Sequence, residues 1–140
     1  MPSPEFPVFL ERSLDVLREQ VPEAYRELDA SLAGQRLRVA VDGAARVLRF
    51  AGGEHALAPD GAADAELRTR GETILALVDG ELGLLDAITR DALFLRGPVE
   101  AVVRLDAALH AYLAGAVRAP GFPPLLHAYR SGVLAAQEPC

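Results

Sequence analysis

The apolar positions of the first 34 residues recur every three or four residues, a spacing typical of amphipathic helices. Ser3-Pro4 supplies a cap and a first helical position, Pro22 restarts the chain, and Gly34 offers a C-terminal cap, so two consecutive helices are predicted over residues 1–34. The side chains expected to face the core are Phe6, Phe9, Leu10, Leu14, Leu17, Val21, Tyr25, Leu28 and Leu32.

The spacing changes to two over residues 36–70, which predicts a meander of four strands. Apolar residues alternate along "RLRVAVDG", and the Asp42-Gly43 turn leads into a second strand with Leu48 and Phe50 on one face. A short third strand over residues 55–58 ends at a Pro-Asp-Gly turn, and "ADAELRTR" supplies the fourth.

Residues 71–118 combine helices with one more strand. Short helices are predicted over 72–78 and 84–88, separated by Asp79-Gly80, and "ALFLRG" is a fifth strand with Phe94 on the face opposite to Leu93. Gly97-Pro98 ends that strand and starts a long helix. The side chains of that helix expected to face inward are Val99, Val102, Val103, Leu109 and Leu113.

The last segment, residues 119–140, is predicted to be a separate tail helix. "APGFPP" interrupts the long helix because neither Pro-Pro nor Pro-Gly fits a helix interior. Beyond it, Leu125, Leu126, Tyr129 and Val133 form an apolar stripe without a partner in the local sequence. The stripe either caps an opening near residues 80–85 or packs permanently on the core.

Composition limits the class of protein. A chain of 140 residues with 51% hydrophobic residues fits a single domain, residues 1–140, with one core. The net charge of −6 argues against nucleic-acid binding, which needs a basic surface. No apolar run approaches about 18 residues and no signal-peptide pattern opens the chain, so we expect a cytoplasmic protein without stable membrane insertion.

Candidate catalytic and metal-binding groups are few. The chain has no Lys and no Asn, which excludes a Schiff-base lysine, a P-loop and a Cys-His-Asn triad. The only cysteine, Cys140, has no partner for a disulfide or a metal, and neither His55 nor His127 has a ligand at metal spacing. Asp106 and His110 lie four residues apart, with Tyr112 nearby, but no nucleophile matches them. We therefore predict no catalysis, no metal and no cofactor.

Arginines follow the predicted strands, mostly opposite the apolar face. This pattern indicates either a solvated sheet face balanced by Glu54 and Glu66 or a dock for an anionic headgroup, a coenzyme A phosphate or an acidic partner protein. The arginines concerned are Arg36, Arg38, Arg49, Arg68, Arg70 and Arg96.

The order helix, four strands, two short helices, strand, long helix resembles the sterol carrier protein 2 (SCP2) lipid-binding domains of the bacterial stand-alone type. The Val41-Asp42-Gly43 hairpin, "ADAEL" leading into "GETILALVDGEL", and the 93–97 strand that ends in Gly are similar to that family's pattern. The resemblance covers residues 6–118. Arg90-Asp91 and Pro98 depart from it, since members often carry Gly-Lys and an acidic residue or Asn there. It implies an α+β fold whose mainly antiparallel five-stranded sheet has helices on one face.

The resemblance also implies a non-catalytic function. Members enclose a hydrophobic tunnel for fatty acids, acyl-CoA, phospholipids or sterols, and the split between the two short helices is a natural place for such a gap. Apolar spacing alone does not distinguish a lined tunnel from a filled core, so an accessory domain that pairs with itself or with an enzyme stays open. A cone-shaped α+β isomerase or cyclase would need an ionisable residue in the cavity. The residues expected to bind the ligand are Phe50, Leu75, Val78, Leu82, Leu85, Ile88, Phe94, Val102, Val103, Leu109, Leu125 and Leu126.

Overall fold

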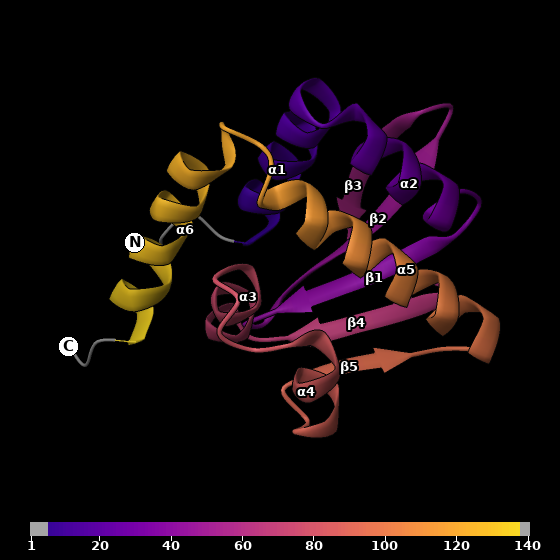
Figure 1. Ribbon diagram of the computed structural model, residues 1–140. Coiled ribbons are helices and arrows are strands. Elements are labelled where there is room, and N and C mark those ends of the chain that lie inside the picture. Colours follow the sequence, from indigo (N-terminus) through magenta and orange to yellow (C-terminus); the bar gives the residue numbers. More distant parts are fainter. Residues whose placement is uncertain (1–5, 138–140) are drawn as a thin grey trace.

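A computed structural model describes residues 6–137 and shows a sheet covered by helices (Figure 1). The predicted order of elements is confirmed, whereas the Ser3-Pro4 cap and Cys140 lie outside the described residues. The elements are α1 (Phe6–Gln20), α2 (Pro22–Leu32), β1 (Arg36–Val41), β2 (Ala44–Ala51), β3 (Glu54–Pro59), β4 (Ala65–Thr69), α3 (Gly71–Val78), α4 (Leu84–Thr89), β5 (Leu93–Arg96), α5 (Val99–Ala116) and α6 (Phe122–Gln137).

The five strands form one mixed sheet in the order β3-β2-β1-β4-β5. The prediction of a five-stranded, mainly antiparallel sheet is confirmed, but the expected four-strand meander is wrong at its last step, because β4 pairs in parallel with β1. The connection after β3 crosses to the far side of β1, where Asp64 accepts the Arg36 N–H at 2.8 Å. This crossing puts Leu67 in the buried middle of the sheet and leaves β3 at an edge.

The buried face of helix α5 matches the predicted one only in part: Leu109 and Leu113 face inward as predicted. Its buried residues are mainly small, and Leu105 is the largest of them. Val99 and Val103 are 81% and 62% exposed, so the prediction that they face inward is wrong. The small residues let α5 lie close to α2: a Cβ added at Gly115 would stand 2.8 Å from the Cβ of Ala24.

The tail helix α6 packs on α1 and α3 (Figure 1). Phe122 is 1% exposed, and the ring of Tyr129 stacks on Phe9 with 4.5 Å between centroids. Two prolines follow Phe122 in the first turn, where a helix needs no backbone N–H. The apolar stripe of the tail therefore finds its partner in the first helix of the chain. Within residues 6–137, no helix has the length and apolarity required to span a bilayer.

Candidate functional site

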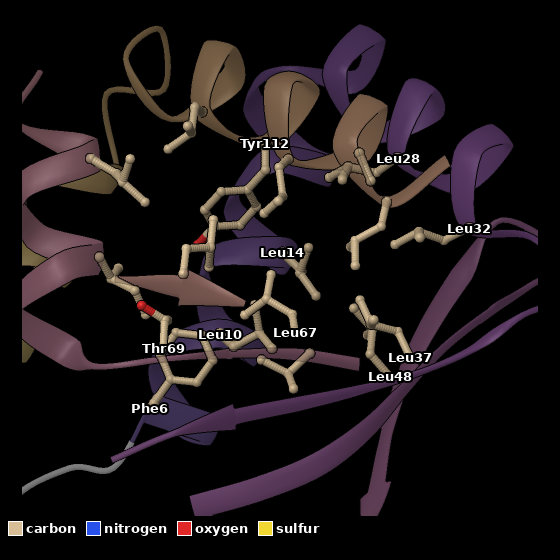
Figure 2. A pocket seen from close by; sticks show the side chains of 18 of the residues that line it. Phe6, Leu10, Leu14, Leu28, Leu32, Leu37, Leu48, Leu67, Thr69 and Tyr112 are labelled. Atoms are coloured by element: carbon tan, nitrogen blue, oxygen red, sulfur yellow. The ribbon is translucent and has the colours of Figure 1, made fainter. Parts of the chain in front are cut away.

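An apolar cavity of about 100 Å³ lies between the inner face of the sheet and the helices (Figure 2). Its lining residues come from elements between α1 and α5, and most of their side chains are aliphatic. The lining residues are Phe6, Leu10, Leu14, Leu28, Leu32, Leu37, Val39, Leu48, Leu67, Thr69, Ile74, Leu77, Val78, Leu93, Leu105, Ala108, Leu109, Tyr112 and Leu113.

Strand alternation supplies the floor of the cavity. Leu37, Val39 and their cross-strand neighbours Leu48 and Leu67 point to the same face because side chains alternate along a strand. The helical spacing of α1 and α2 turns their leucines toward this floor, and α5 and α3 complete the walls. Residues far apart in the sequence therefore meet around one space.

The cavity reaches the surface between α3 and α5. Every lining residue from α1, α2 and the strands is buried, whereas the half-buried lining residues all belong to α3 or α5. The α3 members are Ile74, Leu77 and Val78, and the α5 members are Leu109, Tyr112 and Leu113. Among the described residues, the half-buried lining therefore indicates entry to the cavity between these two helices, which form its rim.

The two polar side chains in the lining, Thr69 and Tyr112, both have hydrogen-bond partners inside the protein. The Thr69 hydroxyl donates to the Ala92 carbonyl at 2.7 Å. Ser13 donates its hydroxyl hydrogen to the Leu10 carbonyl, so in the 2.6 Å contact between the two hydroxyls Tyr112 is the donor. Burial raises the pKa of the Tyr112 phenol, which therefore stays neutral at physiological pH. The cavity thus offers a ligand an uncharged surface.

We expect Ser13→Ala to destabilise the protein by about 1–3 kcal/mol, because it leaves the Tyr112 hydroxyl beside the cavity without an acceptor. Tyr112→Phe removes the donor and leaves Ser13 bonded to Leu10, so its cost should be about 1 kcal/mol. Urea unfolding of the two variants checks this order. Equal stabilities would contradict the assigned donor direction.

Two of the residues predicted to bind ligand, Val78 and Leu109, line the cavity. Three others are corrected: Leu85 and Phe94 are 73% and 45% exposed, and Val103 projects to solvent as described above. Phe94 lies on the outer face of the sheet because it alternates with Leu93, which lines the cavity. The remaining members are buried or half-buried but lie outside the lining: Phe50, Leu75, Leu82, Ile88, Val102, Leu125 and Leu126.

Much of the actual lining is predicted by the sequence to face the core, but the pattern does not mark it as the wall of a cavity. Phe6, Leu10 and Leu14 of α1 were predicted to face inward, and they do, but they border space. No signal in the apolar spacing separates the two cases, because a side chain next to a cavity and one in a packed core occupy the same helical positions.

The other candidate groups do not form a second centre. Asp106 and His110 are an exposed pair on α5. The side chain of His55 is buried, with Nε2 3.0 Å from Asp15 and Nδ1 2.8 Å from the Tyr25 hydroxyl, so it connects the edge strand β3 to α1 and α2. Among the described residues, no group of three His, Cys, Asp or Glu side chains is arranged to hold a metal ion.

This α+β architecture, an apolar cavity between one sheet face and its helices, defines a class of small binding domains. The chain belongs to the SCP-2 sterol transfer family, whose model matches residues 14–110. That membership makes it a lipid-binding or lipid-transfer domain. Among curated proteins, no sequence matches the chain significantly.

Solved structures share the fold at low sequence identity. A Thermus thermophilus protein described as possibly a sterol carrier protein is 22% identical, with a TM-score of 0.54 over 76% of this chain and 82% of that chain. The apo form of sterol carrier protein 2 from Yarrowia lipolytica is 13% identical, with a TM-score of 0.53 over 77% and 88%. A crystal structure of sterol carrier protein 2 is 23% identical, with a TM-score of 0.51 over 87% of this chain and 93% of that chain.

Proposed function

We propose that the protein binds the alkyl or ring portion of a lipid in the cavity beneath the sheet and acts as a carrier without catalysis. The observation that carries this proposal is the lining itself, which is apolar apart from two hydroxyls that already have partners. Burying an alkyl chain there gains about 0.8 kcal/mol per methylene, and no polar group has to be desolvated without compensation.

The cavity has to widen for this function. Its volume of about 100 Å³ is smaller than the roughly 300–1,000 Å³ of typical ligand sites. Helix α3 is the element placed to move, since it forms one side of the rim and ends next to Gly80, whose φ of +77° glycine adopts more easily than other residues. A lipid would therefore enter between α3 and α5 and push α3 outward.

The chemistry of the lining supports a carrier without catalysis. Its sole titratable group is the Tyr112 phenol, and burial raises the pKa of that phenol further from neutrality. A general acid or base works best with a pKa near the working pH. An isomerase or cyclase would need such a group beside the substrate.

The test combines native mass spectrometry of the purified protein, organic extraction of what travels with it, and titration with a fluorescent fatty acid. We expect Leu109→Trp, which places an indole at the rim, to weaken fatty-acid binding by about tenfold or more, because it takes the space of several methylenes. Val103→Trp makes the same change on the exposed side of α5 and should bind like the wild type. Equal binding by both variants, or no binding of fatty acids, acyl-CoAs and sterols, would favour an accessory domain with a filled core.

A further inference from the structure

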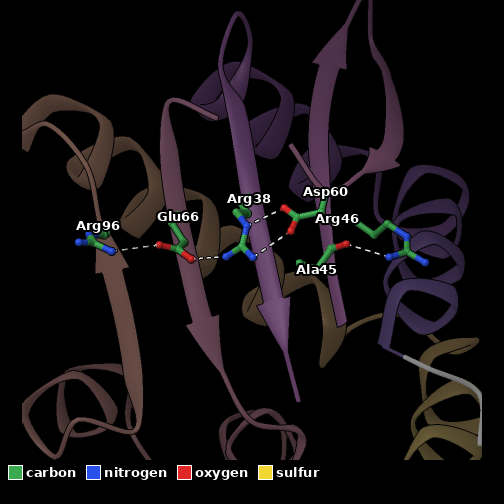
Figure 3. Close-up of polar contacts among 6 residues, drawn as sticks. All are labelled: Arg38, Ala45, Arg46, Asp60, Glu66 and Arg96. Atoms are coloured by element: carbon green, nitrogen blue, oxygen red, sulfur yellow. Dashed lines mark hydrogen bonds and ion pairs between the residues drawn. The ribbon is translucent and has the colours of Figure 1, made fainter. Parts of the chain in front are cut away.

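The outer face of the sheet carries a row of charged side chains that neutralise one another (Figure 3). Arg96 lies 3.7 Å from Glu66, which also pairs with Arg38, and the Arg38 Nε donates to Asp60 at 2.7 Å. The helices lie on the opposite face, so this row is open to solvent (Figure 1). Four of the six arginines that the sequence predicts on this face therefore pair with carboxylates: Arg38 and Arg96 with Asp60 and Glu66, Arg36 with Asp64, and Arg70 with Glu72.

Beside this row lies a hollow of about 430 Å³, within the usual size range of small-molecule sites. Small residues make its floor: Ala40 and Ala45 are paired across β1 and β2 and almost fully buried. Phe94 forms an aromatic wall on β5. The complete lining is Arg38, Ala40, Asp42, Gly43, Ala45, Arg68, Thr69, Arg70, Asp91, Ala92 and Phe94.

Three of the five charged groups around the hollow already have partners. Arg38 belongs to the row described above, Arg70 pairs with Glu72 at 3.1 Å, and Asp42 accepts the Gly71 N–H at 3.0 Å. The remaining two are Arg68 and Asp91. Neither forms an ion pair with any residue in the described part of the chain, and Arg68 instead holds its guanidinium 5.2 Å from the centre of the Phe94 ring. One cation and one anion in the same hollow are thus available.

Asp91 has a backbone conformation that glycine adopts more easily. Its φ is +59°, in the left-handed region, at the position after α4 where helices commonly end in Gly. The Asp91 and Ala92 N–H groups close that helix end on the Ile88 and Ala87 carbonyls. An aspartate at this position makes the turn less stable than a glycine would, and it adds a carboxylate to the hollow.

We propose that this hollow binds a small zwitterion, with the acidic group of the ligand on Arg68, its ammonium on Asp91 and its apolar part over Ala40, Ala45 and Phe94. A simple anion would meet the carboxylates of Asp42 and Asp91, and a simple cation would meet three arginines. A molecule with both charges a few bonds apart complements both free groups. The site lies on the opposite face of the sheet from the lipid cavity, and Thr69 of β4 is the one residue that belongs to both linings.

Two sources supply this chemistry, a free α-amino acid and an aminophosphate lipid headgroup. Titrations of the full-length protein, followed by ¹H–¹⁵N spectra, use phenylalanine for the first and phosphoethanolamine for the second, with benzoate and phenethylamine as singly charged comparisons. We expect saturable changes in chemical shift at residues 40, 45, 68, 91 and 94. Because the ligand is small, its dissociation constant should be on the order of 1 mM. The zwitterion that binds more tightly identifies the source.

Matched variants assign the two charges. Arg68→Gln and Asp91→Asn should each weaken the zwitterion about tenfold, the loss of one charge-assisted contact. Arg49→Gln, on the same sheet face but outside the hollow, should bind like the wild type. Asp91→Gly should raise the melting temperature while it weakens binding at least as much as Asp91→Asn does, which separates a ligand-binding role from a structural one. Benzoate binding as tightly as phenylalanine, unchanged binding by both variants, or no saturable shift would each overturn the proposal.

Discussion

Each methylene added to a saturated fatty acid is expected to tighten its binding about fourfold, until the chain outgrows the widened cavity. The reason is that the cavity presents only apolar surface and satisfied hydroxyls, so the alkyl chain supplies the affinity and the headgroup adds little. Displacement of a fluorescent fatty acid by a homologous series measures the slope. The chain length at which affinity levels off then reports how far α3 moves, because the cavity of about 100 Å³ is too small for a long chain.

Salt provides the control for this series. Screening acts on exposed charges and hardly affects apolar burial, so the affinity of a neutral ligand, such as a long-chain alcohol, should be similar at low and high salt. A flat response to chain length, or a steep loss of affinity for the neutral ligand with salt, would show that binding depends on the surface arginines instead of the cavity.

Phe122→Ala is expected to destabilise the protein by about 3–5 kcal/mol, a large part of the roughly 5–15 kcal/mol that stabilises a typical domain. The Phe122 ring is buried against Phe9 and Tyr112, with centroid separations of 5.8 and 6.1 Å, and its loss leaves a hole between three helices. Thermal and urea unfolding measure the change. His127→Ala, an exposed position on the same helix, serves as the control and should cost little.

Deletion from Phe122 onwards distinguishes the two roles open to the tail. No described residue of α6 lines the cavity, and Tyr129 is held between Phe6 and Phe9 of α1. We therefore expect the truncated chain to lose most of its thermal stability. A folded truncated domain that exchanges ligand faster than the full chain would instead support a lid, in which case the Arg130–Asp79 contact between α6 and α3 at 2.8 Å would be its latch.

Local patterns in the sequence were sufficient to predict the helices and strands and their order along the chain. The change from helical to alternating spacing marks the boundary between α2 and β1, Asp42-Gly43 makes the first hairpin, and Gly80 separates α3 from α4. These features depend on backbone preferences and on which side of a single element is apolar. Both are properties of neighbouring residues, so they can be read without knowing the partner of any element.

Only the tertiary structure decided which elements meet. Three contacts join residues that are distant in the sequence: the parallel pairing of β4 with β1, the packing of the small residues of α5 on α2, and the packing of α6 on α1. The spacing of apolar residues within one element does not specify which element lies next to it. The cavity and the outer hollow likewise depend on which elements pack together. Leu109 lines a space and Val103 faces water on one helix, since helix packing, and not hydrophobicity, determines which apolar side chain remains without contacts.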